Sequence, residues 1–360
     1  MKNSLYIGSP FGIKVTIHWT FLILIAIVVF IDVKNGSSIN EILISVLFVL
    51  TIFGCVILHE LGHSLAARKY GITTRGITLL PIGGLASLTK IPEEPQRELF
   101  VAIAGPLVNV AIATVISIIL FITGFNFSHL SIRYLNLYEF LPALLVINVT
   151  LVIFNLIPAF PMDGGRLLRA GLAFKFNRVK ATNIAAKIGQ LIAIGFAFWG
   201  LFYNPLLIVI AAFVFIGARA ELQDVRSKYF LEGKTIGDLV MKNYTLLNPE
   251  MKLDKVIEIL MNGQEEEFIV MNGSMVAGVV TKNQILKGLS DYDKNASLFK
   301  IMDIDYFAVD INDKVKDIFE KFQTSTQKIA PVFENGEVVG IINFENMNKY
   351  IQVSEALKSR

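Results

Sequence analysis

The sequence has few of the residues on which most soluble domains depend. Its single cysteine, Cys55, cannot form a disulfide within the chain, so a disulfide-bonded scaffold is excluded. Charged residues make up 18% of the 360 residues, against about 25% in ordinary soluble domains. Apolar residues make up 54%, and the mean hydropathy is +0.58. These values exclude a single soluble globule, a disordered chain and a collagen-like chain.

Charged residues are scarce only in the first part of the chain. Up to Ala218 the sequence has 15 basic and 8 acidic residues, whereas from Arg219 onward it has 18 basic and 22 acidic ones. The net charge of +3 is therefore +7 beside −4. The basic excess flanks apolar segments and forms no single basic face, so no nucleic-acid partner is expected. We predict a membrane domain over residues 1–222 and a soluble domain over residues 233–355.

The apolar runs predict an α-helical polytopic membrane protein with about six transmembrane helices, since about 20 apolar residues cross the hydrocarbon core of a bilayer. The run Ile188–Ala218 is too long for one such helix and is interrupted by Asn204–Pro205, which predicts two short helices joined by a tight turn. The other four predicted spans are Val15–Ile31, Ile42–Ala67, Leu99–Ile122 and Phe140–Phe160.

The basic residues predict which ends of these helices face the cytosol. With six spans, the short segments on the side of the N-terminus carry 13 Lys and Arg residues, and the segments on the other side carry two. Basic loops remain in the cytosol. Both termini are therefore expected there, with the protein in the cell (plasma or inner) membrane.

One segment between the second and third spans does not have a helical pattern. Thr73–Leu88 contains Pro81 and the pair Gly83 and Gly84 among apolar residues. Backbone that is not helical is tolerated at membrane depth only where it is buried in protein or faces a water-filled cavity. We therefore expect this segment to dip into the membrane beside a site.

The soluble part repeats itself at a spacing of about 62 residues, in copies at 233–292 and 296–355. In each copy a helical pattern is followed by two apolar strands, and an Asn-Gly pair between the strands is typical of a hairpin turn. The pairs are Asn272-Gly273 and Asn335-Gly336. Two such copies predict a small α+β regulatory module.

Three ionisable residues lie together inside the second span, in the motif His59-Glu60-Leu61-Gly62-His63. Residues four apart lie on one face of a helix, so both imidazoles can reach one Zn²⁺ ion. Glu60 can then take a proton from a metal-bound water. The alternative is a structural cluster of mutually hydrogen-bonded side chains, but ionisable residues inside a span usually mark functional sites.

A hydrolytic zinc site needs a third protein ligand. Of the four histidines, His129 lies in a predicted outer loop, and His18 lies in the first span, where it could line a cavity or pack between helices. Asp163 is the better candidate, because prolines and a Gly-Gly pair break the helix around it. The fourth span also ends on the side to which His63 leads. Four histidines are too few for a membrane di-iron hydroxylase or desaturase.

Four motifs together resemble the site-2 protease family of intramembrane zinc metalloproteases. They are His59–His63 in a predicted transmembrane helix, Pro-Ile-Gly-Gly-Leu-Ala at 81–86, Ala-Gly-Pro-Leu-Val-Asn at 104–109, and Asn-Leu-Ile-Pro-Ala-Phe-Pro-Met-Asp-Gly-Gly-Arg at 155–166. The C-terminal repeat resembles a tandem pair of CBS domains, as in one branch of that family. The resemblance covers almost the whole chain.

The resemblance implies that His59, His63 and Asp163 hold one zinc ion per chain. It also implies that Glu60 is the general base, which later passes a proton to the leaving amine. Asn155 matches the family asparagine that steadies the tetrahedral oxyanion, a role that suits a neutral amide donor in a dry site. Its alternative role is that of a packing amide between helices. Asn109 and Asn148 are interpreted as packing residues.

The family's substrates are membrane-spanning proteins, which are cut within or near a transmembrane segment in regulated intramembrane proteolysis. Gly83 and Gly84 match a loop whose backbone pairs with the unwound substrate. The competing hypothesis is a channel or transporter with a CBS-type gate. It predicts inverted repeats among the spans, which the sequence does not show, and it gives no role to the motif at His59.

The CBS-like repeat departs from its family's pattern. Members that bind adenine nucleotides end their second strand with Gly-hydrophobic-hydrophobic-Thr-x-x-Asp. The first copy keeps Thr281, but Gln284 and Asn346 stand where the two Asp residues would be. This departure puts nucleotide binding in doubt. A module for homodimer formation or substrate capture is about as well expected as one that senses nucleotides.

Overall fold

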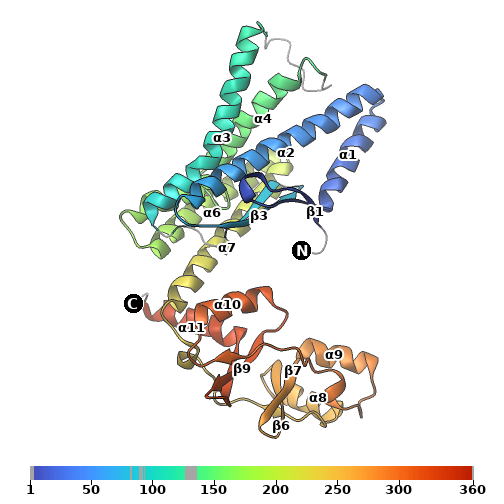
Figure 1. Cartoon of the computed structure of the whole chain (residues 1–360), viewed down its shortest axis with the longest axis vertical. Coiled ribbons are helices and arrows are strands. Elements are labelled where there is room, and N and C mark those ends of the chain that lie inside the picture. The colour runs from blue at the N-terminus through green and yellow to red at the C-terminus, as the bar shows by residue number, and fades with distance from the viewer. Residues whose placement is uncertain (1–3, 82, 89–91, 93, 126–135, 359–360) are drawn as a thin grey trace. The chain divides into compact units, whose positions relative to one another are not determined.

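Two compact units make up the computed structural model, Met1–Gln223 and Asp224–Arg360. The structure describes residues 4–81, 83–88, 92, 94–125 and 136–358 (Figure 1). Helices predominate in the first unit, whereas the second combines helices with two three-stranded sheets. A helical part followed by an α+β part is the fold class that the sequence predicts.

Four helices of the described chain are long and apolar enough to cross a membrane: α2 (Ile39–Arg68), α3 (Pro95–Ile122), α6 (Arg178–Phe202) and α7 (Leu206–Leu231). Two further apolar helices, α1 (Thr20–Lys34) and α4 (Phe140–Leu156), have 15 and 17 residues. At 1.5 Å per residue they are about 22 and 26 Å long. Length alone thus supports four of the expected spans. A shorter helix, α5 (Asp163–Ala173), follows α4.

The first predicted span, Val15–Ile31, is wrong at its start. Val15–His18 forms strand β2, and α1 begins only at Thr20. Three of these four residues are β-branched, which favours a strand. The backbone of β2 pairs with β1 (Ser4–Gly8) on one side and β3 (Thr74–Leu80) on the other. Apolar composition alone did not separate this strand from the helix after it.

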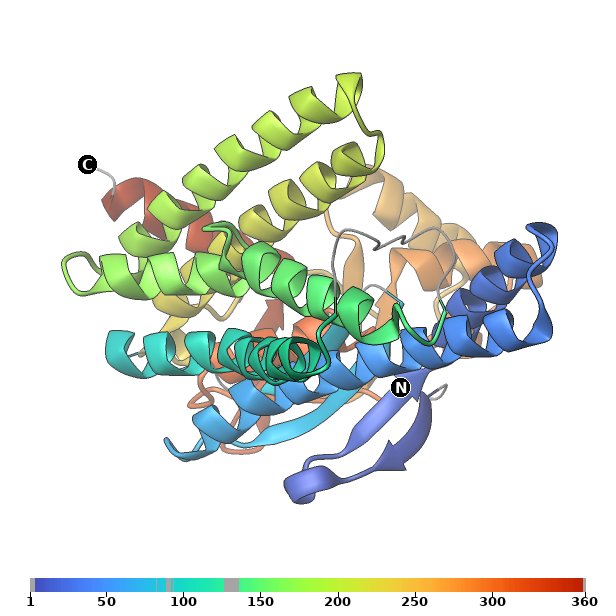
Figure 2. The same cartoon turned by 90° about the horizontal axis from the view of Figure 1, so that it is seen from above.

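The run Ile188–Ala218 forms two helices, α6 and α7, as the sequence predicts. Near the turn Gly200 packs against Ile208, and further along Ala193 and Val214 share a buried cluster. The two helices therefore lie side by side in opposite directions, as the yellow-green pair in Figure 2 shows. Both helices continue beyond the apolar run, because hydropathy marks the depth of the membrane and not the end of a helix.

A four-stranded sheet accompanies the helices of the first unit, in the order β1-β2-β3-β4. The 3-10 turn η1 (Pro10–Gly12) connects β1 to β2, and β3 forms an antiparallel hairpin with β4 (Gly83–Leu88). This hairpin is the non-helical segment expected at Thr73–Leu88. Strand β4 stands at the end of this order, so among the described residues no strand pairs with its other edge.

The second unit contains the predicted repeat. Four elements of the second copy each begin 62 residues after their counterparts in the first. The first copy has α8 (Leu253–Asn262), β6 (Glu267–Asn272), β7 (Met275–Thr281) and α9 (Lys282–Asp291); the second has α10 (Val315–Thr324), β9 (Ile329–Glu334), β10 (Glu337–Asn343) and α11 (Phe344–Lys358). The short strands β5 (Leu246–Leu247) and β8 (Val309–Asp310) complete the sheets, and η3 (Ile236–Asp238) and η4 (Leu298–Lys300) are single 3-10 turns.

Each copy has its own apolar core, and a third cluster joins the two sheets. Leu253 and Phe268 are buried in the first core, and Val315 and Phe322 in the second. The joining cluster is formed by Ile269, Val279, Ile329 and Ile341. The two copies therefore fold as one packed module.

The residue retained from the nucleotide motif has a local structural role. The Thr281 hydroxyl caps α9 by accepting the backbone N–H of Gln284, and the Gln284 side-chain oxygen accepts the backbone N–H of Thr281. This reciprocal pair satisfies two donors at the start of a helix. The cap alone accounts for a threonine at this position.

Candidate metal centre

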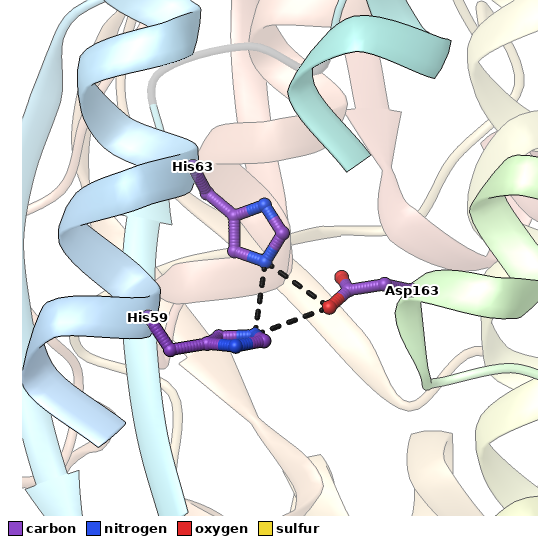
Figure 3. Close-up of side chains that lie close together, drawn as sticks. All are labelled: His59, His63 and Asp163. Atoms are coloured by element: carbon purple, nitrogen blue, oxygen red, sulfur yellow. Dashed lines mark hydrogen bonds and ion pairs between the residues drawn. The ribbon is translucent and has the colours of Figure 1, made fainter. Parts of the chain in front are cut away.

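Three buried side chains from two helices converge in the first unit (Figure 3). His59 and His63 lie one turn apart on α2, and Asp163 is the first residue of α5. Asp163 Oδ2 lies 3.2 Å from His59 Nε2 and 3.1 Å from His63 Nε2, and the two Nε2 atoms are 3.1 Å apart. The three residues are 4–7% exposed. They form a compact triangle of one oxygen and two nitrogen atoms.

This donor set fits a zinc ion. Zinc bonds to nitrogen and oxygen are about 2.0–2.1 Å long, so neighbouring ligands of a tetrahedral site lie about 3.3–3.4 Å apart. The observed sides of 3.1–3.2 Å are within a few tenths of that spacing. Two imidazole lone pairs and a carboxylate oxygen would repel one another without a cation between them. The sequence proposed these same three residues as ligands.

The break between α4 and α5 directs Asp163 toward the histidines. Helix α4 ends at Leu156, the peptide bond between Phe160 and Pro161 is cis, and α5 begins at Asp163. The carboxylate therefore stands at a helix N-terminus, where an anion is stabilised by the unpaired N–H groups. A straight continuation of α4 would not have provided this turn.

Helix α3 supports both histidines, which the sequence analysis missed. His63 Nδ1 donates to the carbonyl oxygen of Val101 at 2.7 Å, and His59 Nδ1 lies 2.5 Å from Asn109 Oδ1. Between these residues, a Cβ atom on Gly105 would lie 2.2 Å from His63 Nε2, so only glycine leaves room for the ring. Val101, Gly105 and Asn109 follow one another at intervals of four residues, which places them on one face of the helix. That spacing within the third span could have indicated a face turned toward the histidines.

A cluster of charged side chains surrounds Arg169, which lies about two turns after Asp163 on α5. Arg169 is fully buried, and its Nε and Nη2 donate to Glu98 Oε1 at 2.8 and 2.5 Å. Its Nη1 donates to Glu221 Oε1 at 2.5 Å, and Arg178 donates to the second oxygen of Glu98 at 3.1 Å. Two arginines thus form ion pairs with two carboxylates in this cluster. In the sequence these arginines resemble ordinary juxtamembrane charges, and their pairing was not predicted.

The other proposed site residues lie around the triangle. Glu60 is half-buried and interacts electrostatically with His59, His63 and Asp163. A Cβ on Gly84 of β4 would lie 2.8 Å from Cγ of Glu60, so the absence of a side chain lets the strand approach this residue.

The remaining candidates are less closely placed. Asn155 is half-buried in the last turn of α4, and Gly83 begins β4. His18 lies at the end of β2, where its Nδ1 is 2.8 Å from the Thr20 hydroxyl. His129 lies outside the described residues.

Comparison with known sequences gives the family. The model of "Peptidase family M50" matches residues 47–134 and 126–196, and that of "CBS domain" matches residues 236–291 and 298–353. "Zinc metalloprotease MJ0392" of Methanocaldococcus jannaschii is 33% identical over 356 residues, which cover 99% of this chain and 98% of that protein. "Putative zinc metalloprotease sll0528" of Synechocystis sp. is 27% identical, in a match that covers 99% of this chain and 97% of that protein.

A solved structure titled "Site-2 Protease from Methanocaldococcus jannaschii" is also similar. The two sequences are 39% identical, the match covers 61% of this chain and 95% of the solved one, and the TM-score is 0.45. A relative that is one-third identical over nearly the full length of both chains is sufficient to assign the family. The chain therefore belongs to peptidase family M50, the site-2 protease family of metalloendopeptidases, and carries two CBS domains at its C-terminal end.

Proposed function

We propose that this chain is an intramembrane endopeptidase with one zinc ion, which hydrolyses a peptide bond within or near the transmembrane segment of a protein substrate. The observation that carries the proposal is the buried triangle of His59, His63 and Asp163, with the carboxylate of Glu60 beside it. Because four helices long and apolar enough to cross a membrane accompany this triangle, we expect its substrates to be membrane-spanning proteins.

The residues divide the chemistry among them. His59, His63 and Asp163 would hold the zinc ion, which when bound would supply Lewis acidity toward the scissile carbonyl and the attacking water. Glu60 takes a proton from that water and delivers it to the leaving amine. The side-chain amide of Asn155 donates a hydrogen bond to the oxyanion that develops on the carbonyl oxygen.

The edge of β4 that pairs with no described strand is the proposed binding place of the substrate. A transmembrane helix has all its amides bonded internally, so the scissile segment must unwind before a peptide bond can react. An unwound segment can pair with β4 at Gly83 and Gly84, because no strand of the described chain pairs with that edge. Since Gly84 packs on Glu60, a strand bound there runs past the proposed base.

We assign the membrane protease to residues 1–222 and the CBS pair to residues 233–292 and 296–355, with both termini in the cytosol. The CBS pair regulates activity, homodimer assembly or substrate capture. Adenine nucleotide binding is the less favoured role, because Gln284 and Thr281 are occupied in capping a helix. Titration of the purified chain with AMP, ATP and S-adenosylmethionine, followed by calorimetry and by peptidase rate, tests this order of preference.

The catalytic proposal is tested by replacing the base. The Glu60→Gln variant should retain zinc, because Glu60 is not a ligand, but should cleave a model membrane-spanning substrate in liposomes about 10²–10⁴-fold more slowly. Glu94→Gln, which changes an exposed carboxylate on the same unit, is the matched control. If Glu60→Gln cleaves at the parental rate, Glu60 is not the base.

A further inference from the structure

Two fully buried asparagines connect His59 to the backbone of another helix. Asn109 Oδ1 lies 2.5 Å from His59 Nδ1, and Asn109 Nδ2 donates to Asn148 Oδ1 at 2.9 Å. Asn148 Nδ2 in turn donates to the carbonyl oxygen of Leu144 at 2.9 Å. The chain of hydrogen bonds thus runs from α4 through α3 to α2. It ends on the nitrogen of His59 that faces away from the triangle.

The carbonyl at the end of this chain fixes the direction of every bond in it. A backbone carbonyl can only accept, so Asn148 must present its amide nitrogen to Leu144 and its oxygen to Asn109. Asn109 must then present its nitrogen to Asn148 and its oxygen to His59. An oxygen facing Nδ1 requires that Nδ1 carry the proton. The lone pair of His59 is therefore on Nε2, which faces His63 and Asp163.

We propose that Asn109 and Asn148 are positioning residues that hold His59 in the tautomer able to bind the metal, with Asn148 acting only through Asn109. The proposal rests on the zinc site proposed above. His63 reaches the same state without an intermediary, because its Nδ1 donates directly to the Val101 carbonyl. A backbone carbonyl oxygen thus fixes the proton on Nδ1 of both histidines. It does so directly for His63, and through the Asn109 and Asn148 amides for His59.

This role differs in its consequences from simple packing. If the amides only joined α3 to α4, their replacement would change the stability of the fold and leave the metal affinity of the folded protein unchanged. In the relay, loss of Asn148 frees the Asn109 amide to rotate and to present its nitrogen to His59 Nδ1. The imidazole would then be driven to the tautomer with its proton on Nε2, which leaves no lone pair on the nitrogen that faces His63 and Asp163. The discriminating quantity is therefore zinc affinity.

The test measures zinc affinity of the full chain in detergent by competition with a chromophoric chelator at fixed pH. Loss of an outer-shell partner typically lowers metal affinity about 10–100-fold, and this range is expected for Asn148→Leu and for Asn109→Leu. Asn109→Asp keeps an acceptor oxygen toward His59 and should recover most of that loss. Thr150→Val is the matched control and should bind zinc like the parent, because Thr150 also bonds to the carbonyl four residues earlier on α4 but is exposed.

The outcomes separate the relay from the site on which it rests. If Asn148→Leu binds zinc like the parent, the asparagines are packing residues and the relay is wrong. If Asn109→Asp loses as much affinity as Asn109→Leu, an acceptor oxygen facing His59 Nδ1 is not what supports the metal, and the relay is again wrong. If the parent binds no zinc, or Asp163→Asn binds it equally well, the zinc site itself is wrong. Thermal unfolding of each variant with the metal removed by chelator shows which losses come from the fold.

Discussion

The two units differ in how many polar side chains they bury beside their apolar ones. Among the described residues, ten buried polar or charged side chains lie in the first unit and two in the second, Ser227 and Gln327. The first unit instead exposes large apolar residues such as Phe121, which is 87% exposed. In lipid, burying apolar surface gives no driving force, so packing and hydrogen bonds hold helices together. In the first unit the proposed metal ligands and the buried ion pairs therefore share an interior with apolar side chains, whereas the CBS pair is held mainly by apolar cores.

The sharpest way to test this contrast is to remove a buried charge from the first unit. Arg169→Met leaves the buried Glu98 with Arg178 as its ion-pair partner and removes the ion pair of Glu221, and breaking a buried pair costs about 3–5 kcal/mol. We expect a large loss in the thermal stability of the full chain in detergent, together with weaker zinc binding, because α5 begins with Asp163. Arg97→Met removes an exposed cation from α3 and serves as the control. Equal unfolding temperatures for the two variants would contradict the structural role of the cluster.

The converse change removes apolar volume from the second unit. Leu253 is fully buried in the core of the first CBS copy, and Leu→Ala substitutions in cores cost about 2–5 kcal/mol. Leu253→Ala should make the second unit more sensitive to protease in the full chain and leave zinc affinity unchanged. Met261→Ala, at a 77% exposed position on the same helix, should leave protease sensitivity unchanged. A fall in zinc affinity with Leu253→Ala would show that the two units are energetically coupled.

The smallest expected effect concerns a carboxyl group of the second unit. Burial, and then the nearby carboxylate of Glu345, raise the pKa of Glu267 from 4.5 to about 7, against the opposing effect of Lys328. Between these two values the folded state binds more protons than the unfolded state, so the free energy of unfolding falls as pH rises through this window. We expect the second unit to resist protease better at pH 5.5 than at pH 8, and Glu267→Gln to reduce that difference.

The exposed neighbour Glu266 provides the control for this titration. Glu266→Gln should retain the parental pH dependence, because the Glu266 carboxylate is a minor influence on Glu267. A parental pH dependence in Glu267→Gln would assign the effect to another group.

The sequence was most informative where one local pattern determines one contact. His59 and His63 are four residues apart on a helix, so their convergence needs no knowledge of tertiary structure. Asp163 was inferred from the break in its helix and from the side on which two spans end. The repeat in the second unit follows from equal spacing. The structure brings these three side chains together and contains the repeat. Each of these features follows from a pattern local to one or two segments.

The contacts that were missed depend on which helices lie side by side. Asn109 and Asn148 lie 39 residues apart, and no pattern in either span indicates that they meet. Arg169 and Glu221 belong to different helices, and each resembles an ordinary charge near a membrane surface. Val15–His18 was assigned to a helix, because its strand partners lie in other segments. Pairing between distant segments is a tertiary property that one sequence does not state.

The position of Arg169 has a mechanical consequence. One guanidinium group holds a carboxylate of α3 and another of α7, and it belongs to the same helix as a proposed metal ligand. Helix α7 is also the element that precedes the CBS pair along the chain. If α7 turns or slides enough to withdraw Glu221, a fully enclosed cation loses half of its partners. A displacement of α7 that breaks this ion pair would therefore also disturb the helix that begins at Asp163.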